Sequence, residues 1–469
     1  MEKIDFSILI ILYFTLLIAL LFYLIRTNTR KKCIPMHNGF LFSILFYFIL
    51  IPIFIILNIN DLISMEQSTG KYCSNTFERF IINNNMGNYL YSFLLVILSV
   101  IIFLFFYKIS YKKNQSRNLV FKDDNIYKIV KVAMFCTFWI GLISLVVFFG
   151  SFGGISNALS YAEKMRNMSS SLVEEIGGIA ALFKITARLI TVTPFLIILL
   201  INIKKEYRDK YFPFFIISMI ASVLFYIYNA GRMPIILFML CFFYYFMCTK
   251  VKKTWSLILL LGIASLPLLD VFDSLFVYFN SGVWQMKSTN YLNYIYQFSY
   301  PYKNSLLLID LNNTFGHRWF LDYFYAILDY FPGVSFEPPY VDLSLYVRGS
   351  DWMNLGGVPT DFITFSHMQL SFLGIIILSA VLGYFAQIID YKTSLFNNKK
   401  VKNLLIAILT LYTFSSFVSF DPFSIIKGQF ILLISIIVIL ASSKKEVSWK
   451  FYLLAHHHLN IVHLQICVI

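Results

Sequence analysis

The chain has few charged residues, and this scarcity excludes an ordinary soluble domain. Only 13% of its 469 residues are charged, 59% are hydrophobic, and the mean hydropathy is +0.73. Apolar runs of about 20 residues recur along the sequence, and each is long enough to cross the hydrocarbon core of a bilayer. The sequence therefore predicts an all-α polytopic integral membrane protein, organised as a single membrane domain over residues 1–469.

The sequence also lacks the motifs of a disulfide-bonded or metal-dependent protein. Its six cysteines include no CxxC pair, and only Cys73 is predicted to face outward, so we expect no disulfide and no cysteine metal site. No glycine-rich phosphate loop and no internal repeat is present. We therefore expect neither a metal nor another cofactor.

Eleven apolar runs define the predicted transmembrane helices. They cover residues 6–25, 39–58, 88–107, 132–150, 181–203, 212–229, 234–249, 255–272, 367–388, 403–420 and 424–441. The connections after odd-numbered spans, together with the tail, hold 25 of the 38 Lys and Arg residues but only 6 of the 24 acids. Because basic connections stay in the cytoplasm, we expect the amino terminus outside and the carboxyl terminus inside.

One outer connection, residues 273–366, is much longer than the others, whereas residues 442–469 form the predicted cytoplasmic tail. A loop of this length is rarely only a connector. Residues 316–331 within it predict an amphipathic helix that lies on the outer leaflet. Its apolar face holds Phe320, Phe324, Ile327, Leu328 and Phe331, and its polar face holds Arg318, Asp322, Tyr325 and Asp329.

Three cations stand out because charge inside or beside an apolar span is costly and is often functional. Lys184 and Arg188 lie one turn apart in the outer half of the fifth span, and Arg232 occupies a short outer hairpin. A guanidinium group binds phosphate oxygens in a bidentate manner, so these residues are candidates for holding a pyrophosphate. The alternative is contact with lipid head groups or with a loop carboxylate.

Candidate proton acceptors also lie on the predicted outer side. His317 and His367 are the only histidines expected there, and an imidazole with an ordinary pKa can accept a proton from a hydroxyl near neutral pH. The alternative for each is a hydrogen-bonded interfacial histidine. The carboxylates of the large loop are alternative bases, among them Asp322, Asp351 and Asp361.

This layout resembles the Wzy-type O-antigen polymerases, which join oligosaccharide repeat units. The matching pieces are Gly231-Arg232 before the seventh span, the turn Gly356-Gly357-Val358-Pro359-Thr360-Asp361, and Leu373-Gly374 in the ninth span. Some members carry Arg-x10-Gly in two outer loops. Arg166 and Gly177 fit that pattern, whereas the position matching glycine after Arg348 is Pro359.

The resemblance implies a membrane glycosyltransferase of the bacterial inner membrane, without a metal. It would transfer a growing polymer from undecaprenyl pyrophosphate to the next lipid-linked repeat unit, in contact with membrane lipids and with a chain-length regulator as a further candidate partner. Arg188, Arg232, Arg318, Arg348 and Lys184 would neutralise the leaving pyrophosphate. His317, His367, Asp322, Asp351 or Asp361 would take the proton of the acceptor hydroxyl.

Two other functions remain open from the sequence. A polysaccharide-to-lipid ligase uses similar chemistry and differs in its acceptor. A flippase for lipid-linked oligosaccharides would have short loops on both sides, and the 273–366 loop disfavours it. Neither reading involves nucleic acid, although the net charge of +14 would suggest it in a soluble protein.

Overall fold

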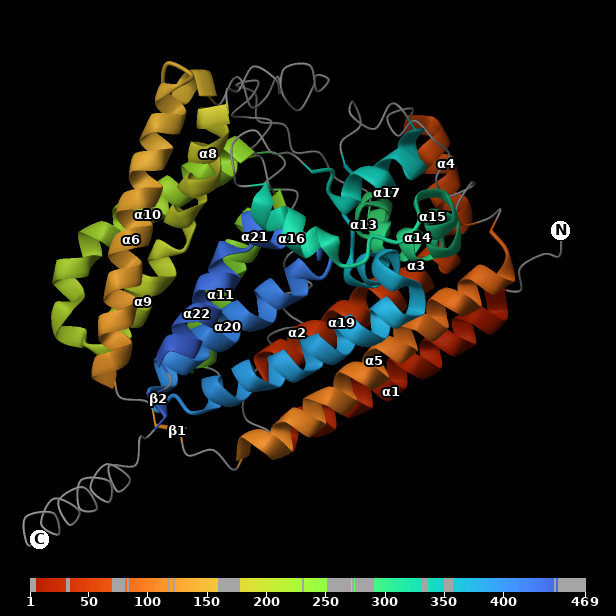
Figure 1. Cartoon of the computed structure of the whole chain (residues 1–469), viewed down its shortest axis with the longest axis horizontal. Helices are drawn as coiled ribbons and strands as arrows, with labels where there is room; N and C mark the ends of the chain where they lie inside the picture. Colours follow the sequence, from red (N-terminus) through yellow and green to blue (C-terminus); the bar gives the residue numbers. More distant parts are fainter. Residues whose placement is uncertain are drawn as a thin grey trace, which may run out of the picture.

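The computed structural model describes residues 6–30, 34–69, 81, 84–115, 119–120, 123–158, 178–229, 232–250, 271, 274, 291–329, 336–349, 357–442 and 444–445. Apart from one pair of two-residue strands, the regular structure in these ranges is helical (Figure 1). Apolar runs form helices in these ranges because a backbone in lipid must satisfy its own hydrogen bonds.

The helices that make up the bundle lie side by side (Figure 1). Their bounds are α1 Phe6–Arg30, α2 Pro35–Leu45, α3 Ile51–Leu57, α5 Met86–Gln115, α6 Asp123–Gly150, α8 Gly178–Ala187, α9 Thr193–Ile203, α10 Arg208–Asn229, α11 Arg232–Lys250, α19 Phe362–Ser394, α20 Lys399–Ser416, α21 Pro422–Gly428 and α22 Phe430–Ser442. A π-helical segment, Phe46–Leu50, joins α2 to α3, and a 3-10 turn, Arg188–Thr191, joins α8 to α9.

The remaining helices gather mainly at one end of the bundle. They are α4 Ile59–Thr69, α13 Tyr291–Phe298, α14 Tyr300–Ser305, α15 Leu308–Phe315, α16 Leu321–Leu328 and α17 Pro339–Arg348, and a 3-10 turn at Lys205–Tyr207 lies elsewhere. Five of them, α13 to α17, belong to the predicted large loop. The two strands are β1 Leu119–Val120 and β2 Lys444–Lys445.

Seven described helices are long and apolar enough to cross a membrane, and a bent pair, α21 with α22, makes an eighth if it counts as one span. The predicted class, an all-α multi-pass membrane protein, is confirmed. The count of eleven stays a prediction. The helix over 234–249 offers only a short apolar stretch, Pro234–Phe246, and α20 is not among the seven. Apart from residue 271, span 255–272 lies outside the described residues.

Helices α5 and α19 pack closely along their length (Figure 1). A Cβ atom added to Gly383 of α19 would lie 2.3 Å from the carbonyl oxygen of Phe103 in α5. Small residues allow membrane helices to approach until their backbones touch, which supplies dispersion energy in a solvent as apolar as the side chains. Glycine at this position therefore permits the contact between the two helices.

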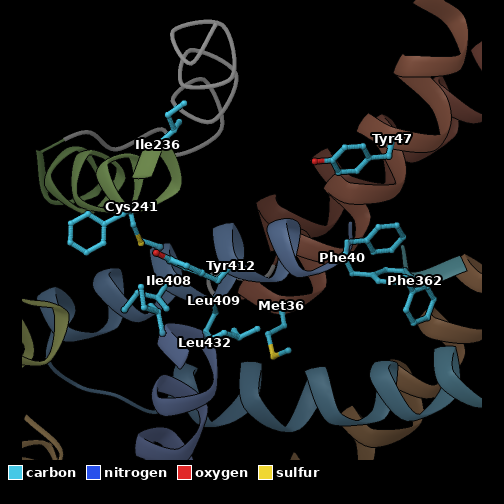
Figure 2. Close-up of a cluster of buried hydrophobic side chains, with 14 of the residues drawn as sticks. Met36, Phe40, Tyr47, Ile236, Cys241, Phe362, Ile408, Leu409, Tyr412 and Leu432 are labelled. Carbon is cyan, nitrogen blue, oxygen red and sulfur yellow. The ribbon is translucent and has the colours of Figure 1, made fainter. Parts of the chain in front are cut away.

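A buried core connects the first and last parts of the chain. Figure 2 shows Met36 and Phe40 of α2 near Leu409 of α20 and Phe362 of α19, with Tyr412 of α20 pointing toward Cys241 of α11. The rings of Phe40 and Phe103 stack with centroids 4.0 Å apart. This core fixes α11, α20 and α22, the helices that carry the cavity described below.

Polar contacts at one end of the bundle join segments that the sequence predicts to be cytoplasmic. The buried Asp390 carboxylate accepts from the backbone N–H of Met36 (2.8 Å) and from the Tyr107 hydroxyl (2.9 Å). β1 pairs antiparallel with β2, and Asn398 donates to the carbonyl of Asn202 (2.7 Å). These connections, all predicted to share a side, do meet at one end, while which side of the membrane that end faces stays a prediction.

Helix α19 is broken near its start, where Leu370 and Ser371 leave helical geometry and Ser371 has φ +51°. The break leaves backbone carbonyl groups of α19 without partners inside the helix, and backbone N–H groups of the loop donate to them. The backbone N–H of Arg318 donates to Met368 (3.0 Å), and that of Trp319 donates to Gln369 (3.2 Å). The loop is therefore attached directly to a membrane helix.

The loop helix starts later than the sequence predicted. Residues 316–320 are not helical, since Trp319 and Phe320 have φ of +55° and +61°, and α16 begins at Leu321. The predicted start at residue 316 is wrong because the donors of these residues serve the carbonyls of α19. Within α16, Phe324 and Ile327 are exposed and Asp322 is buried, and residues 330–331 lie outside the described residues.

Candidate functional site

A cavity of about 400 Å³ lies between α10, α11, α20 and the bent pair α21 and α22, with the start of α17 at its rim. Its polar lining comes from Arg188, Thr191, Tyr226, Tyr340, Tyr412, Ser415, Ser419, Ser424, Lys427 and Gln429. Helix α22 runs 13 residues, about 20 Å, from this cavity toward β2. The cavity therefore lies at the end of α22 opposite the β1 and β2 pair, the same end that carries α16 and α17 (Figure 1).

Arg188 and Lys427 bring two positive charges to this cavity from segments 239 residues apart. Arg188 stands in the 3-10 turn that precedes Pro194, and its Nη1 donates to the backbone carbonyl of Lys427. Its guanidinium carbon lies 5.8 Å from the centre of the Phe225 ring. The guanidinium group is thus held against a carbonyl and an aromatic face and is half-buried.

The bend between α21 and α22 forms part of the cavity wall. The two helices meet at an angle of 80°, at Gly428 and Gln429. A Cβ atom on Gly428 would lie 3.4 Å from Nη1 of Arg188, so the absence of a side chain leaves room for the guanidinium group. Helix α22 starts directly after Gln429, which lines the cavity, so the N–H groups of its first turn lie at the cavity wall. A helix N-terminus favours negative charge.

Lys427 also joins the loop to the bend. Its Nζ forms an ion pair with the carboxylate of Asp329, the residue that follows α16. The Lys427 side chain is 31% exposed and that of Asp329 is 15% exposed, so the pair is only partly shielded from solvent. Tyr340 stands nearby, where burial and the negative charges of Asp421 and Asp329 raise the pKa of its hydroxyl.

A second charged cluster lies under the loop and is internally paired. The Arg318 guanidinium binds Asp322 (Nε to Oδ1, 3.0 Å) and Asp342 (Nη1 to Oδ2, 2.5 Å), and Gln369 donates to Asp322 (2.8 Å). Burial opposes the charge on Arg318, but the two carboxylates outweigh burial and raise its pKa. Burial raises the pKa of Asp342; the contact with Arg318 acts in the opposite direction, and the negative charges of Glu337 and Asp322 add to the rise.

His367 is buried in α19 and both of its ring nitrogens have partners. Nε2 lies 2.8 Å from the Tyr91 hydroxyl, and Nδ1 lies 3.1 Å from the side-chain amide of Asn312. His317 is exposed at the non-helical start of the loop segment, with its ring 6.1 Å from that of Trp319. Neither histidine lines the cavity.

Asp361 caps the start of α19. Its side chain is fully buried and accepts from the backbone N–H of Ile363 (3.0 Å) and from the Thr364 hydroxyl (2.7 Å). Burial raises its pKa to about 6, with the Thr364 hydrogen bonds acting in the opposite direction. This geometry gives the carboxylate a role in folding, and it does not reach the cavity.

The remaining candidate cations are distributed around the same end. Lys184 lies one turn before Arg188, with its Nζ 5.5 Å from the centre of the Tyr228 ring. Arg348 donates to the Tyr300 hydroxyl (3.0 Å) away from the cavity. Arg232 is the first residue of α11, two positions before the lining residue Pro234. Asp351, Arg166 and Gly177 lie outside the described residues.

Lys427 is the residue of this site that sequence reasoning missed. It lies inside the predicted span 424–441, so the rule that selected Arg188, a charge within an apolar run, applies to it equally. The adjacent Gly428 and Gln429 indicate a helix break, which would have explained how the charge is tolerated. Within the part of the chain that the structure describes, no group of three or more His, Cys, Asp or Glu side chains is placed to hold a metal ion.

No protein-family model, no curated protein and no solved structure matches this chain.

Proposed function

We propose that this protein joins undecaprenyl-pyrophosphate-linked oligosaccharide repeat units into a polysaccharide at the outer face of a bacterial inner membrane. One observation carries the proposal: Arg188 and Lys427 converge on a cavity at a broken membrane helix, at the end of the bundle that holds the large loop. A pyrophosphate at the membrane boundary is a ligand whose charge matches these two cations.

The cavity supports the leaving-group half of the reaction. When the bond between the anomeric carbon and the pyrophosphate breaks, negative charge develops on the leaving oxygen. Fixed cations and the N-terminus of α22 would stabilise that charge in a site that is partly shielded from water. Arg232 stands at the start of a helix that lines the cavity, so it remains a candidate for the second phosphate.

The tyrosines that line the cavity are suited to binding the sugars of the two substrates. Tyr226, Tyr340 and Tyr412 combine an aromatic face with a hydroxyl, and together they make the cavity wall apolar with a few polar groups. The exposed apolar face of α16, which includes Phe324 and Ile327, would rest in the outer leaflet and keep the loop beside the lipid carrier.

The first experiment is complementation in a bacterial strain from which the native gene has been deleted. We expect the wild-type gene to restore a ladder of long polysaccharide, while Arg188→Ala and Arg232→Ala leave chains of one repeat unit. Lys399→Ala, an exposed cation at the opposite end, serves as the matched control and keeps the ladder. If the wild-type gene leaves chain length unchanged, the polymerase proposal is wrong, and unattached long polymer in the deletion strain would point to ligation instead.

A further inference from the structure

The ion pair between Asp329 and Lys427 is the one charged contact that links the loop to the wall of the cavity among the described residues. Lys427 lines the cavity, whereas Asp329 stands one side chain behind it, at the end of α16. The Arg318 cluster, by contrast, joins loop residues to one another. The Asp329 pair therefore responds to whatever binds Lys427.

An anion that enters the cavity would compete for Lys427. Arg188 and Lys427 line the same cavity, so an anion bound there can contact both side chains. A pyrophosphate carries more negative charge than a carboxylate and offers more acceptor oxygens. The Asp329 side chain is 15% exposed, so water already reaches this carboxylate while it is paired with Lys427.

We propose, resting on the function proposed above, that Lys427 exchanges Asp329 for the pyrophosphate of the bound donor, and that the released Asp329 accepts the proton of the acceptor sugar hydroxyl. Ligand binding would in this way turn a structural carboxylate into a general base, so that the base becomes active only when the donor is present.

The step balances without a co-reactant. The acceptor oxygen forms a bond to the anomeric carbon of the donor while the bond from that carbon to the pyrophosphate oxygen breaks. The hydroxyl proton moves to the Asp329 carboxylate, and the bonding electrons leave with the pyrophosphate, whose charge Arg188 and Lys427 neutralise. Removing a nearby cation from a carboxylate favours its protonated form, which is the direction that the transfer requires.

The two partners of the pair therefore have different roles, and two single variants separate them. Binding is measured with farnesyl pyrophosphate on the full-length protein in lipid nanodiscs, and transfer is followed as the polysaccharide ladder. We expect Asp329→Asn to bind the probe at least as tightly as wild type, because the substitution removes the carboxylate that competes with the probe for Lys427. We expect its transfer rate to fall by about 100-fold or more.

Lys427→Ala should weaken binding of the probe by about 10-fold or more, since it removes a charge-assisted hydrogen bond. Asp310→Asn, an exposed acid on α15, is the matched control and should change neither quantity. If the ion pair only holds the loop against the cavity wall, Asp329→Asn and Lys427→Ala will weaken binding of the probe to the same extent. That result would overturn the proposal. It is also overturned if Asp329→Asn keeps the wild-type transfer rate.

The charge-swapped double variant, Asp329→Lys with Lys427→Asp, guards against misfolding of the single variants. It keeps an ion pair at this place, so we expect it to accumulate in the membrane, bind the probe poorly and make no polymer. Wild-type polymer from this variant would contradict the proposal.

Two outcomes separate this inference from the function on which it rests. In the first outcome, the wild-type protein makes no polymer, yet the two single variants change probe binding in opposite directions. This result would refute the polymerase function and support the exchange of partners at Lys427. Polymer from both wild type and Asp329→Asn would leave the function standing and refute the role of Asp329.

Discussion

At the scale of single residues, burial separates carboxylates that fold the protein from those that stay available. Asp361 and Asp329 belong to the same predicted loop region, yet Asp361 is enclosed and caps α19, whereas Asp329 keeps some exposure and pairs with a cavity residue. The sequence counted both residues among the carboxylates of the large loop that are alternative bases. Position in the chain could not distinguish them, because burial depends on packing between distant elements.

The raised pKa of Asp361 predicts a specific pH dependence of stability. Its value of about 6 exceeds the ordinary 3.8, so between these values the folded protein binds the proton more readily than the unfolded chain. The free energy of unfolding should therefore rise as the pH falls from 7 to 4, by about 2 kcal/mol for this group.

Asp361→Asn tests this expectation, because asparagine can cap a helix but does not titrate. Thermal unfolding in detergent is compared with wild type at pH 7 and pH 4, with Asp310→Asn as an exposed control. The stability of wild type relative to Asp361→Asn should increase by about 2 kcal/mol from pH 7 to pH 4. A difference that is independent of pH would show that Asp361 titrates normally.

At the scale of elements, the break in α19 organises the loop. A straight helix would have satisfied the carbonyls of Met368 and Gln369 internally, whereas here the backbone of Arg318 and Trp319 satisfies them. Hydrophobic periodicity predicted a helix from residue 316. The pattern shows which side chains would share a helix face, but it contains no information on hydrogen bonds that the backbone makes to another element. The position of α16 could be found approximately from sequence, and its start could not.

Gly374 is the residue that permits this break. A Cβ atom there would lie 2.0 Å from the backbone carbonyl oxygen of Ser366, so the two parts of α19 would have to move apart. We expect Gly374→Ala to lower the free energy of unfolding by about 1–3 kcal/mol or more, as overpacking does in tight interiors.

Gly150→Ala is the matched control, because no atom lies within 4 Å of the added Cβ atom. Both variants are measured by thermal unfolding in the same detergent. Equal stability of the two would mean that the close approach of Ser366 and Gly374 is not required for the fold.

At the scale of the whole molecule, the distribution of charge predicted which connections share a side, and the contacts agree with that grouping. β1 and β2, Asn202 and Asn398, and Met36 and Asp390 meet at one end, although they are far apart in the chain. The cavity needed more than this pattern, because Arg188 and Lys427 converge only when α21 bends away from α22. Composition locates spans and sides, but the bend depends on local packing around Gly428.

The side of the membrane that the cavity faces decides whether the proposed reaction is accessible to flipped, lipid-linked sugars. Basic connections predict that the end with β1 and β2 is cytoplasmic and that α15 to α17 face outward. A variant whose six native cysteines are replaced by serine allows this to be tested with single cysteines at two exposed positions, Asp310→Cys on α15 and Lys400→Cys on α20.

We expect a membrane-impermeant maleimide to label Asp310→Cys in intact spheroplasts and to label Lys400→Cys only after permeabilisation. Labelling of both positions in denatured protein controls for their reactivity. The reverse pattern would place Arg188 and Lys427 at the cytoplasmic leaflet, where the same pair of cations would meet lipid pyrophosphates before export, and would exclude polymerisation at the outer face.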